Sequence, residues 1–400
     1  MHVTATLPQT ISAGRRAAFE VLEAVAKEAY ASDALRDATR VLSTRDAGLA
    51  GQIVFGVLRH QSQLDYLISK YAGRPVEKLD LVVKIALRAA IFQLRYLERI
   101  PAYAAVHDAV ELVKRRKRAA SGLTNAILRK VNRDAVTWPD TATELSAPGW
   151  LIARWSRHFD EAQARKIARA ALQEPIRYIR VPAGEALPPG VEAEATAVAG
   201  CYRLHSGLLP GMRLQDIGSQ TIVPLLDLRA GMRYLDLCAA PGNKTLQALE
   251  APLARAVACD ISPQRIGDIP AACPRVVLDA TQPLPFATLF DRILIDAPCS
   301  GTGTLGRNPE IKWRVSESDF GRFGHKQIQI ARQAIRLLAP GGKLVYATCS
   351  LEHEENEDVV QTLLAHDPEL RCEHEMWRLP GRDEGDGFYA AVLTLPKASG

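Results

Sequence analysis

The first 200 residues of this 400-residue sequence contain no cysteine. The seven cysteines all lie in the second half, at Cys201, Cys238, Cys259, Cys273, Cys299, Cys349 and Cys372. Their number is odd and no pair has the Cys-x-x-Cys spacing, which argues against both a disulfide framework and a zinc knuckle. The cysteines are therefore candidates for packing or for thiol chemistry.

Long apolar runs are also missing. No run approaches the ~18 residues that a membrane-spanning helix needs. Met1 to Ser12 lacks the basic segment and following apolar segment of a secretory signal. We therefore expect a cytoplasmic protein with no membrane association. His205, His325 and His353 show no ligand spacing, so no metal site is predicted.

Charge is unevenly distributed along the chain. Residues 1–135 contain 22 Lys and Arg against 13 Asp and Glu, a net charge of +9, which leaves −4 for the remainder of a chain with a total of +5. A basic N-terminal third indicates a nucleic-acid partner. Its densest run is a candidate phosphate contact, although such a run is also common on a solvated helix face; it comprises Lys114, Arg115, Arg116, Lys117 and Arg118.

Hydrophobic patterns divide the chain into three parts. Residues 12–134 have apolar residues at helical spacing throughout, which predicts an all-α bundle as a domain over 1–135. The region 136–205 predicts a small α/β connector, with one helix over 151–173, a strand over 176–181 and a loop over 184–200. From 206 to 400, short apolar strands alternate with helical stretches, which is typical of a doubly wound, mostly parallel sheet. The fold class is thus multidomain, α followed by α/β.

Six strands are expected in the last part, and the residues that follow them are candidates for chemistry, because ligands bind beyond the carboxyl ends of such strands. The strands are Tyr234–Leu237, Ala256–Cys259, Arg275–Leu278, Arg292–Ile295, Lys343–Tyr346 and Tyr389–Leu395.

Three consecutive strand ends together favour a bound adenosine. The loop from Cys238 to Lys244 has small residues that let a ligand approach the backbone. Asp260 lies 18 residues after Gly242, the spacing of an acid that bonds a ribose diol. Asp279 ends the third strand, where it could accept from an adenine amino group. Each aspartate alone would more often be a helix cap or a solvated loop residue.

Two cysteines also lie at strand ends, Cys299 and Cys349, where a thiolate would be available as a nucleophile. The other cysteines, such as Cys259 and Cys273, fit an apolar packing role. Methylation of a pyrimidine carbon needs both a thiolate and an adenosine-type methyl donor. Carbon 5 of cytosine is a poor nucleophile until a thiolate adds to carbon 6 and creates an enamine. The spacing does not say which cysteine attacks.

Several segments resemble motifs of the RNA 5-methylcytosine methyltransferases of the bacterial RsmB (Fmu/Sun) type. They are Asp236–Thr245, Asp296–Thr304 and Pro340–Ser350, with further matches at Leu214–Gln220, Arg307–Trp313 and Asp386–Ala390. The N-terminal helices resemble a NusB-like RNA-binding domain at Ile100–Val106 and Thr124–Arg129. The resemblance implies a NusB-like bundle, the connector, and a Rossmann-like class I methyltransferase domain over 206–400. It also implies S-adenosylmethionine as cofactor.

The resemblance also implies roles for individual residues. Cys349 would attack carbon 6, and Cys299 would assist removal of the carbon 5 proton and release of the enzyme. Asp296 would contact the cytosine edge and Lys244 would point towards the reacting groups. S-adenosylmethionine would be held by Cys238, Ala239, Ala240, Pro241, Gly242, Asn243, Lys244, Asp260, Asp279 and Asp296.

One position departs from the family pattern: Asn243 stands where a second glycine is usual. Because asparagine tolerates a left-handed backbone, we expect the turn to survive. Arg307, Lys312 and Trp313 follow the Asp296 loop and are candidate RNA contacts around the target base, although Trp313 could equally be core.

The substrate that the resemblance implies is small-subunit (16S) ribosomal RNA, naked or partly assembled, acted on by a monomer. Transfer RNA is the alternative substrate for the same chemistry. A different class is also possible, a NusB-like RNA-binding factor with an inactive methyltransferase domain. The presence of both cysteines and all three aspartates argues against that class.

Overall fold

The computed structural model describes residues 11–270 and 273–397, which form two compact units. The helical unit comprises the chain up to residue 157 together with 171–173 and 306–313, and the sheet unit comprises the rest. The connector predicted over 136–205 is therefore shared between the two units. Within the described ranges, no helix combines the length and the apolar character that crossing a bilayer requires.

The helical unit is all-α, as predicted, and contains no strand among its described residues. Its α-helices are α1 (Ala13–Val25), α2 (Ala31–Thr39), α3 (Thr44–Arg59), α4 (Gln61–Ala72), α5 (Leu81–Tyr96), α6 (Ala102–Lys117), α7 (Ser121–Leu128), α8 (Thr141–Glu144), α9 (Gly149–His158) and most of the short α13 (Ile311–Arg314). Capping residues determine where several of these helices begin or end. Ser43 caps α3 by accepting from Asp46 N, Asp80 caps α5 by accepting from Val82 N, and α4 ends at a left-handed Gly73.

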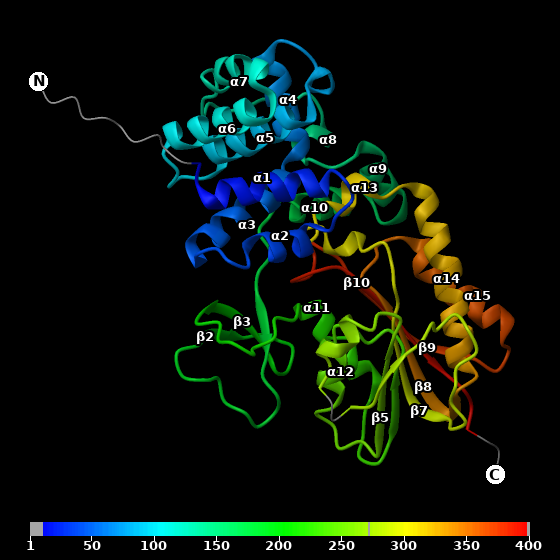
Figure 1. The fold of residues 1–400 in the computed structure, drawn as a ribbon. Helices are drawn as coiled ribbons and strands as arrows, with labels where there is room; N and C mark the ends of the chain where they lie inside the picture. The colour runs from blue at the N-terminus through cyan, green and yellow to red at the C-terminus, as the bar shows by residue number, and fades with distance from the viewer. Residues whose placement is uncertain (1–10, 271–272, 398–400) are drawn as a thin grey trace, which may run out of the picture. The chain divides into compact units, whose positions relative to one another are not determined.

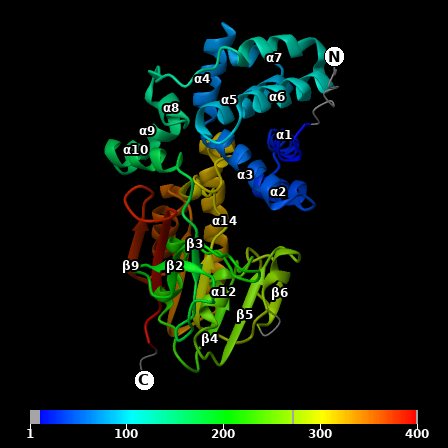
Figure 2. The same cartoon turned by 90° about the vertical axis from the view of Figure 1, so that its left-hand side faces the viewer.

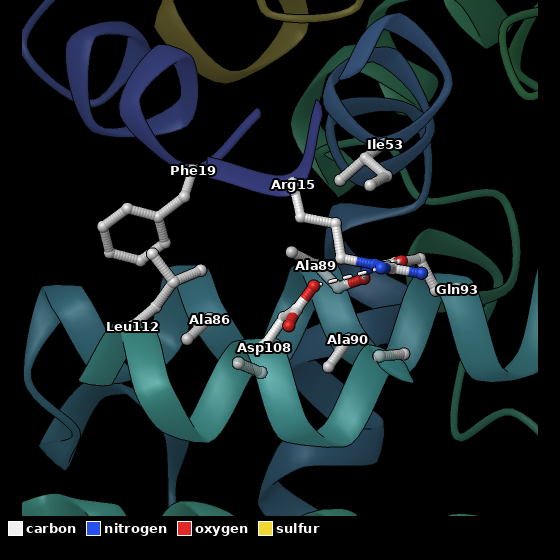
Figure 3. Close-up of a pocket in the computed structure, with 11 residues that line it drawn as sticks. Arg15, Phe19, Ile53, Ala86, Ala89, Ala90, Gln93, Asp108 and Leu112 are labelled. Atoms are coloured by element: carbon white, nitrogen blue, oxygen red, sulfur yellow. Dashed lines mark hydrogen bonds and ion pairs between the residues drawn. The ribbon is translucent and has the colours of Figure 1, made fainter. Parts of the chain in front are cut away.

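A buried polar cluster joins three helices of this bundle. The Arg15 guanidinium of α1 lies between Gln93 of α5 and Asp108 of α6, with contacts of 2.6 Å to Gln93 Oε1 and 3.0 Å to Asp108 Oδ2 (Figure 3). Alanines of α5 and α6 surround it and leave a small pocket. Each polar group of the cluster has a partner, so it can be buried in an otherwise apolar core.

The sheet unit is built on a seven-stranded sheet of order β6-β5-β4-β7-β8-β10-β9 (Figures 1 and 2). The first five strands in this order, β6, β5, β4, β7 and β8, are parallel, and β10 pairs antiparallel with both β8 and β9. The strands are β4 (Arg233–Asp236), β5 (Arg255–Asp260), β6 (Arg275–Val277), β7 (Phe290–Asp296), β8 (Leu338–Thr348), β9 (Arg371–Arg378) and β10 (Phe388–Thr394). All six predicted strands are present, and the predicted fold class is confirmed.

Both faces of the sheet are buried, which explains the nearly continuous apolar strands. Alternate residues of β7 point to opposite sides: Ile293 and Ile295 pack with α14 (Glu317–Ile335) and α15 (Glu357–His366), whereas Leu294 packs with α12 (Asn243–Ala248). The Ser316 and Asp319 capping box fixes the start of α14. Helices on each face thus leave the carboxyl ends of the central strands as the place for chemistry.

A second, three-stranded sheet of order β1-β3-β2 holds the remainder of the connector. Its strands are β1 (Tyr178–Arg180), β2 (Glu192–Ala195) and β3 (Cys201–Ser206). Part of the predicted loop over 184–200 is therefore the strand β2. The single helix predicted over 151–173 is two helices, α9 and α10 (Glu161–Ala170), separated at 159–160.

Candidate active site

The carboxyl ends of β5, β4, β7 and β8 lie side by side because these four strands are parallel neighbours. This topology brings together segments that are far apart in the sequence: the loop after Asp236, the loop after Asp260, the Cys299 loop (residues 297–304) and the Cys349 loop (residues 349–352). Their side chains form the candidate site.

The loop after β4 turns sharply at Gly242, whose φ of 107° lies in the left-handed region. A Cβ atom there would stand 2.6 Å from Ile269 Cγ1, so both conformation and space require glycine. Asn243 is the first residue of α12, and its Nδ2 donates to Leu214 O at 3.1 Å. The turn is formed with Asn243 in place, as expected, but the left-handed residue is Gly242 and not Asn243.

Asp236 ends β4 and is fully buried. Its Oδ2 accepts from Tyr234 Oη at 3.1 Å and from Thr245 Oγ1 at 2.7 Å. Its Oδ1 has no hydrogen-bond partner among the described residues. Burial raises the pKa of Asp236 to about 7. An acceptor left open at this strand end is suited to a ligand that brings a donor or a positive charge.

The aspartates at the ends of the next two strands are held by nearby groups. Asp260 is buried and accepts from Ala240 N at 3.0 Å and from Ser262 N at 2.8 Å. Asp279 is exposed, and hydrogen bonds from the backbone and hydroxyl of Thr281 lower its pKa. Both side chains are thus oriented as carboxylates with remaining acceptor capacity.

Two exposed apolar side chains accompany these aspartates, and the sequence reasoning did not select them. Ile261 directly follows β5 and is 61% exposed, and Val277 ends β6 and is 53% exposed. β5 and β6 are adjacent strands. The signal in the sequence was an apolar residue within two positions of each acid. Such a pair can contact a flat apolar ring while the acids contact its polar substituents.

Lys244 of α12 and Asp296 at the end of β7 form an ion pair, with 2.6 Å between Nζ and Oδ2. Lys244 is only 8% exposed, and its ammonium also lies 5.2 Å from the centre of the Phe388 ring. The Asp296 side chain remains one third exposed. A carboxylate with an open side and a fixed cation beside it can hold or move a proton on a bound base.

Cys299 and Cys349 lie side by side, with 3.4 Å between their Sγ atoms. Both are half-buried, and neither forms a disulfide. The hydrogen bond with Cys349 and burial raise the pKa of the Cys299 thiol well above its ordinary value. The structure therefore brings the two predicted cysteines together, and their contact and burial disfavour the thiolate form of Cys299.

The remaining cysteines differ from this pair. Cys201, Cys259 and Cys273 are buried, and burial raises the pKa of each thiol. Cys238 borders the β4 loop and is half-buried, and burial raises the pKa of its thiol as well. Burial favours a packing role for Cys201, Cys259 and Cys273.

The basic run is at the exposed C-terminal end of α6. Lys114 pairs with Glu111 at 3.0 Å, Arg116 with Glu23 at 3.3 Å, and Lys117 with Asp80. Arg115 and Arg118 are exposed as well. Three of the five cations thus have a carboxylate of the helical unit nearby, which reduces the positive charge of the run.

The segment after the Cys299 loop has a different environment from the one predicted. Residues 306–313 are part of the helical unit, where Lys312 Nζ donates to Arg59 O at 2.9 Å and Trp313 Nε1 donates to Leu58 O at 2.8 Å. Both carbonyl groups belong to the last turn of α3, where backbone oxygens lack helical partners and need a donor from elsewhere. Lys312 is 1% exposed. The prediction that Lys312 contacts RNA is therefore wrong, and the contact of Trp313 favours the alternative of a packing role.

Two further contacts fix this segment. The Glu310 carboxylate accepts from Ala31 N at 3.0 Å, at the first residue of α2, and Gly306 O accepts from Arg59 Nε at 3.0 Å. A carboxylate at a helix N-terminus and a cation at a helix C-terminus both complement the helix dipole. Arg307 is half-buried in the same segment, and its role in RNA binding stays a prediction.

Burial lowers the pKa of Lys312 to about 7, far below the ordinary value. Between that value and about 10.4 the unfolded chain binds a proton that the folded chain does not, so stability rises with pH. We expect the free energy of unfolding of the unmodified protein to increase by about 2 kcal/mol from pH 7 to pH 9, relative to that of Lys312→Met. Denaturant unfolding of both proteins at the two pH values measures this difference.

Lys70→Met is the matched control, because Lys70 is an exposed lysine of α4 in the same unit. Its difference from the unmodified protein should not change between the two pH values. Equal pH dependence in the unmodified protein and Lys312→Met would show that the ammonium is not buried in the folded state.

The fold and the site together define a class of protein. A Rossmann-like sheet with an adenosine-compatible loop, two acids and adjacent thiols at its carboxyl edge is that of an S-adenosylmethionine-dependent cytosine-5 methyltransferase. The family model for 16S rRNA methyltransferase RsmB/F matches residues 223–394, and the model for the NusB family matches residues 12–133.

Comparison with known proteins gives the family. Ribosomal RNA small subunit methyltransferase B of Salmonella paratyphi B is 33% identical over 95% of this chain and 98% of its own length. The protein of that name from Klebsiella pneumoniae is 33% identical over 94% of this chain and 96% of its own length. The chain therefore belongs to the RsmB/F family of 16S rRNA methyltransferases, which confirms the predicted activity and cofactor.

Solved structures agree with the fold. PH0851 has a TM-score of 0.79 and 23% identity, covering 97% of this chain and 100% of its own. NSun6 from Pyrococcus horikoshii has a TM-score of 0.54 and 18% identity, covering 62% of this chain and 98% of its own. The first likeness extends over both units, and the second over part of the chain.

Proposed function

We propose that this chain methylates carbon 5 of one cytosine in naked or partly assembled small-subunit RNA, with Cys349 as the nucleophile. The single observation that supports these roles is the 3.4 Å separation of the Cys299 and Cys349 sulfur atoms, at strand ends next to the Lys244–Asp296 ion pair. Two thiols side by side can act on two adjacent ring carbons of one base.

The steps follow from the side chains. The Cys349 thiolate would form a bond to carbon 6, and ring nitrogen 3 would take a proton from water, which the Asp296 carboxylate stabilises. Bound S-adenosylmethionine would supply the methyl group to carbon 5. Cys299, after giving its own proton to water, would accept the carbon 5 proton. The electrons of that C–H bond re-form the double bond between carbons 5 and 6, the bond from carbon 6 to Cys349 breaks, and nitrogen 3 returns its proton to water. Cys349 is thereby regenerated as a thiolate.

The residues present fit S-adenosylmethionine, which supplies a methyl group on a positively charged sulfur when bound. The open acceptor Asp236 Oδ1 suits its charged amino-acid part, and Asp260 suits the ribose hydroxyls. Asp279 suits the adenine amino group, with Ile261 and Val277 as apolar contacts for the ring. Gly242 leaves the backbone accessible where a side chain would collide with Ile269.

The helical unit supplies the RNA contacts in this proposal, through the exposed end of α6. We expect Arg115→Gln/Arg118→Gln to lower the slope of log K against log salt by about 1–2, because each lost phosphate contact removes ~0.7–0.9 from it. RNA binding measured from low to moderate salt checks this. Lys70→Gln/Lys78→Gln removes two exposed lysines elsewhere on the unit and should leave the slope unchanged. If the slope is unaltered in the arginine variant, the basic run over 114–118 does not contact phosphate.

The target base must leave its stack to reach the thiols, so a cytosine in an accessible loop is the expected substrate. We further propose that the protein acts in the cytoplasm as a monomer. Mass spectrometry of RNA from a deletion strain tests the function. Loss of one 5-methylcytosine from 16S ribosomal RNA, restored by the unmodified gene and not by Cys349→Ala, is the expected result. Loss of a 5-methylcytosine from transfer RNA instead, or no loss of any 5-methylcytosine in the deletion strain, would refute the proposal.

A further inference from the structure

Glu355 is a buried carboxylate without a role in the mechanism above. It ends a short 3-10 helix, His353–Glu355, after the Cys349 loop, and is 0% exposed. Its four hydrogen-bond donors are all neutral: Ser300 Oγ and Ser350 Oγ on Oε1, and Ser300 N and Gln327 Nε2 on Oε2. Burying a carboxylate without a cation beside it is costly, so a residue of this kind needs a reason beyond packing.

The donors show what the carboxylate connects. Ser300 follows Cys299 directly, and the amide that Glu355 Oε2 accepts from, at 2.8 Å, is the peptide bond between these two residues. Ser350 follows Cys349 directly and donates to Oε1 at 2.6 Å. The two hydroxyl oxygens are 3.1 Å apart. One carboxylate thus bonds to the residue after each cysteine.

Other contacts also join or fix the same loops, among them the hydrogen bond that Leu351 N donates to Thr302 Oγ1 at 2.9 Å. Asn356 Nδ2 donates to Ser350 O at 3.0 Å, and Gly303 N donates to Cys349 O at 2.8 Å. Glu355 is also anchored through its backbone, because Tyr346 Oη donates to its carbonyl oxygen at 2.5 Å. The Glu355 carboxylate is therefore held in a fixed position between the Cys299 and Cys349 loops.

We propose that Glu355 is a positioning residue that sets the separation of the two thiols, so that one reaches carbon 6 of the cytosine while the other reaches the proton on carbon 5. The inference rests on the proposed roles of the two cysteines. A neutral side chain in its place cannot accept all four hydrogen bonds. In Glu355→Gln an amide nitrogen replaces one acceptor oxygen, so both serine hydroxyls have to turn to accept from it. The negative charge that strengthens all four hydrogen bonds is also lost, which loosens the hold on both loops.

The test uses the full-length protein and two readouts. In Glu355→Gln we expect kcat for methyl transfer to fall by about 100-fold with KM for S-adenosylmethionine unchanged, because a displacement near 1 Å has an effect of this size. The second readout is disulfide formation between Cys299 and Cys349 with diamide, which takes up the two protons and two electrons of the thiols. Its rate should fall by at least about 10-fold. This readout needs neither RNA nor methyl donor, so it is independent of which cysteine attacks.

Glu354→Gln is the matched control, since Glu354 is half-buried on the same turn, and both rates should equal those of the unmodified protein. If Glu355→Gln does not fold, as judged by circular dichroism, Ser350→Ala takes its place; it removes one bond to the carboxylate and should lower both rates by about 10-fold. Unchanged rates in Glu355→Gln, or in Ser350→Ala where that variant is needed, would overturn the proposal. A normal disulfide rate with slow methyl transfer would also overturn it.

Discussion

Cys349→Ala is expected to lose methyl transfer by at least about 10⁴-fold and to form no covalent complex with RNA, because no thiolate is left to activate carbon 5. Cys299→Ala should behave differently. Cys349 can still attack carbon 6, but removal of the carbon 5 proton and release fail, so an enzyme–RNA adduct accumulates. The two cysteines have sulfur atoms only 3.4 Å apart, yet their substitutions should give opposite results on a denaturing gel: an enzyme–RNA adduct in Cys299→Ala and none in Cys349→Ala.

The contact between the two sulfur atoms fits this order of events, because either substitution leaves the other thiol in place beside the target base. The measurement is gel electrophoresis with labelled 16S ribosomal RNA and S-adenosylmethionine, together with the mass of the intact adduct. Cys372→Ala is the control, because Cys372 is a half-buried cysteine of β9 and should not affect either reaction. An adduct in Cys349→Ala and none in Cys299→Ala would make Cys299 the nucleophile.

The site residues that follow the strands could be predicted from the sequence, because the geometry of a parallel sheet determines where they lie. Parallel strands carry their following residues to one edge, so Asp260, Asp296 and Cys349 could be selected from the pattern of apolar runs alone. The strand β9 was missed since its residues are mostly exposed or half-buried and charged, as in Arg371–Arg378, and no apolar run marks it. Pattern reasoning detects buried strands better than edge strands of this kind.

Other parts of the site needed three-dimensional contacts. Lys312 follows the Cys299 loop in sequence, which suggested a place near the target base, but its segment packs within the helical unit. Glu355 lies in a run of charged residues, Glu352–Glu357, that is typical of a solvated surface. Only packing shows that its carboxylate is buried between two serines. Proximity along a chain and polarity of a segment are both weak guides to tertiary position.

Asp296→Asn is expected to lower kcat by about 10²–10⁴-fold, the range that a positioned acid or base contributes. Asparagine keeps the shape of the side chain but removes the negative charge that would stabilise a proton on ring nitrogen 3 as Cys349 adds to carbon 6. It also leaves the Lys244 ammonium, 2.6 Å away and only 8% exposed, without its carboxylate. RNA affinity should be nearly unchanged, because base contacts are few relative to phosphate contacts.

Single-turnover methylation and the rate of adduct formation separate the possible roles of Asp296. If the carboxylate assists attack on carbon 6, both rates should fall together in Asp296→Asn. Asp291→Asn is the control on the same strand: Asp291 pairs with Arg233 at 2.9 Å in a partly exposed ion pair, whose loss has a small effect. Adduct formation at the normal rate in Asp296→Asn would show that the carboxylate acts after the attack. Normal rates of both steps would limit Asp296 to holding Lys244, and the proton on nitrogen 3 would then have to be stabilised by another group.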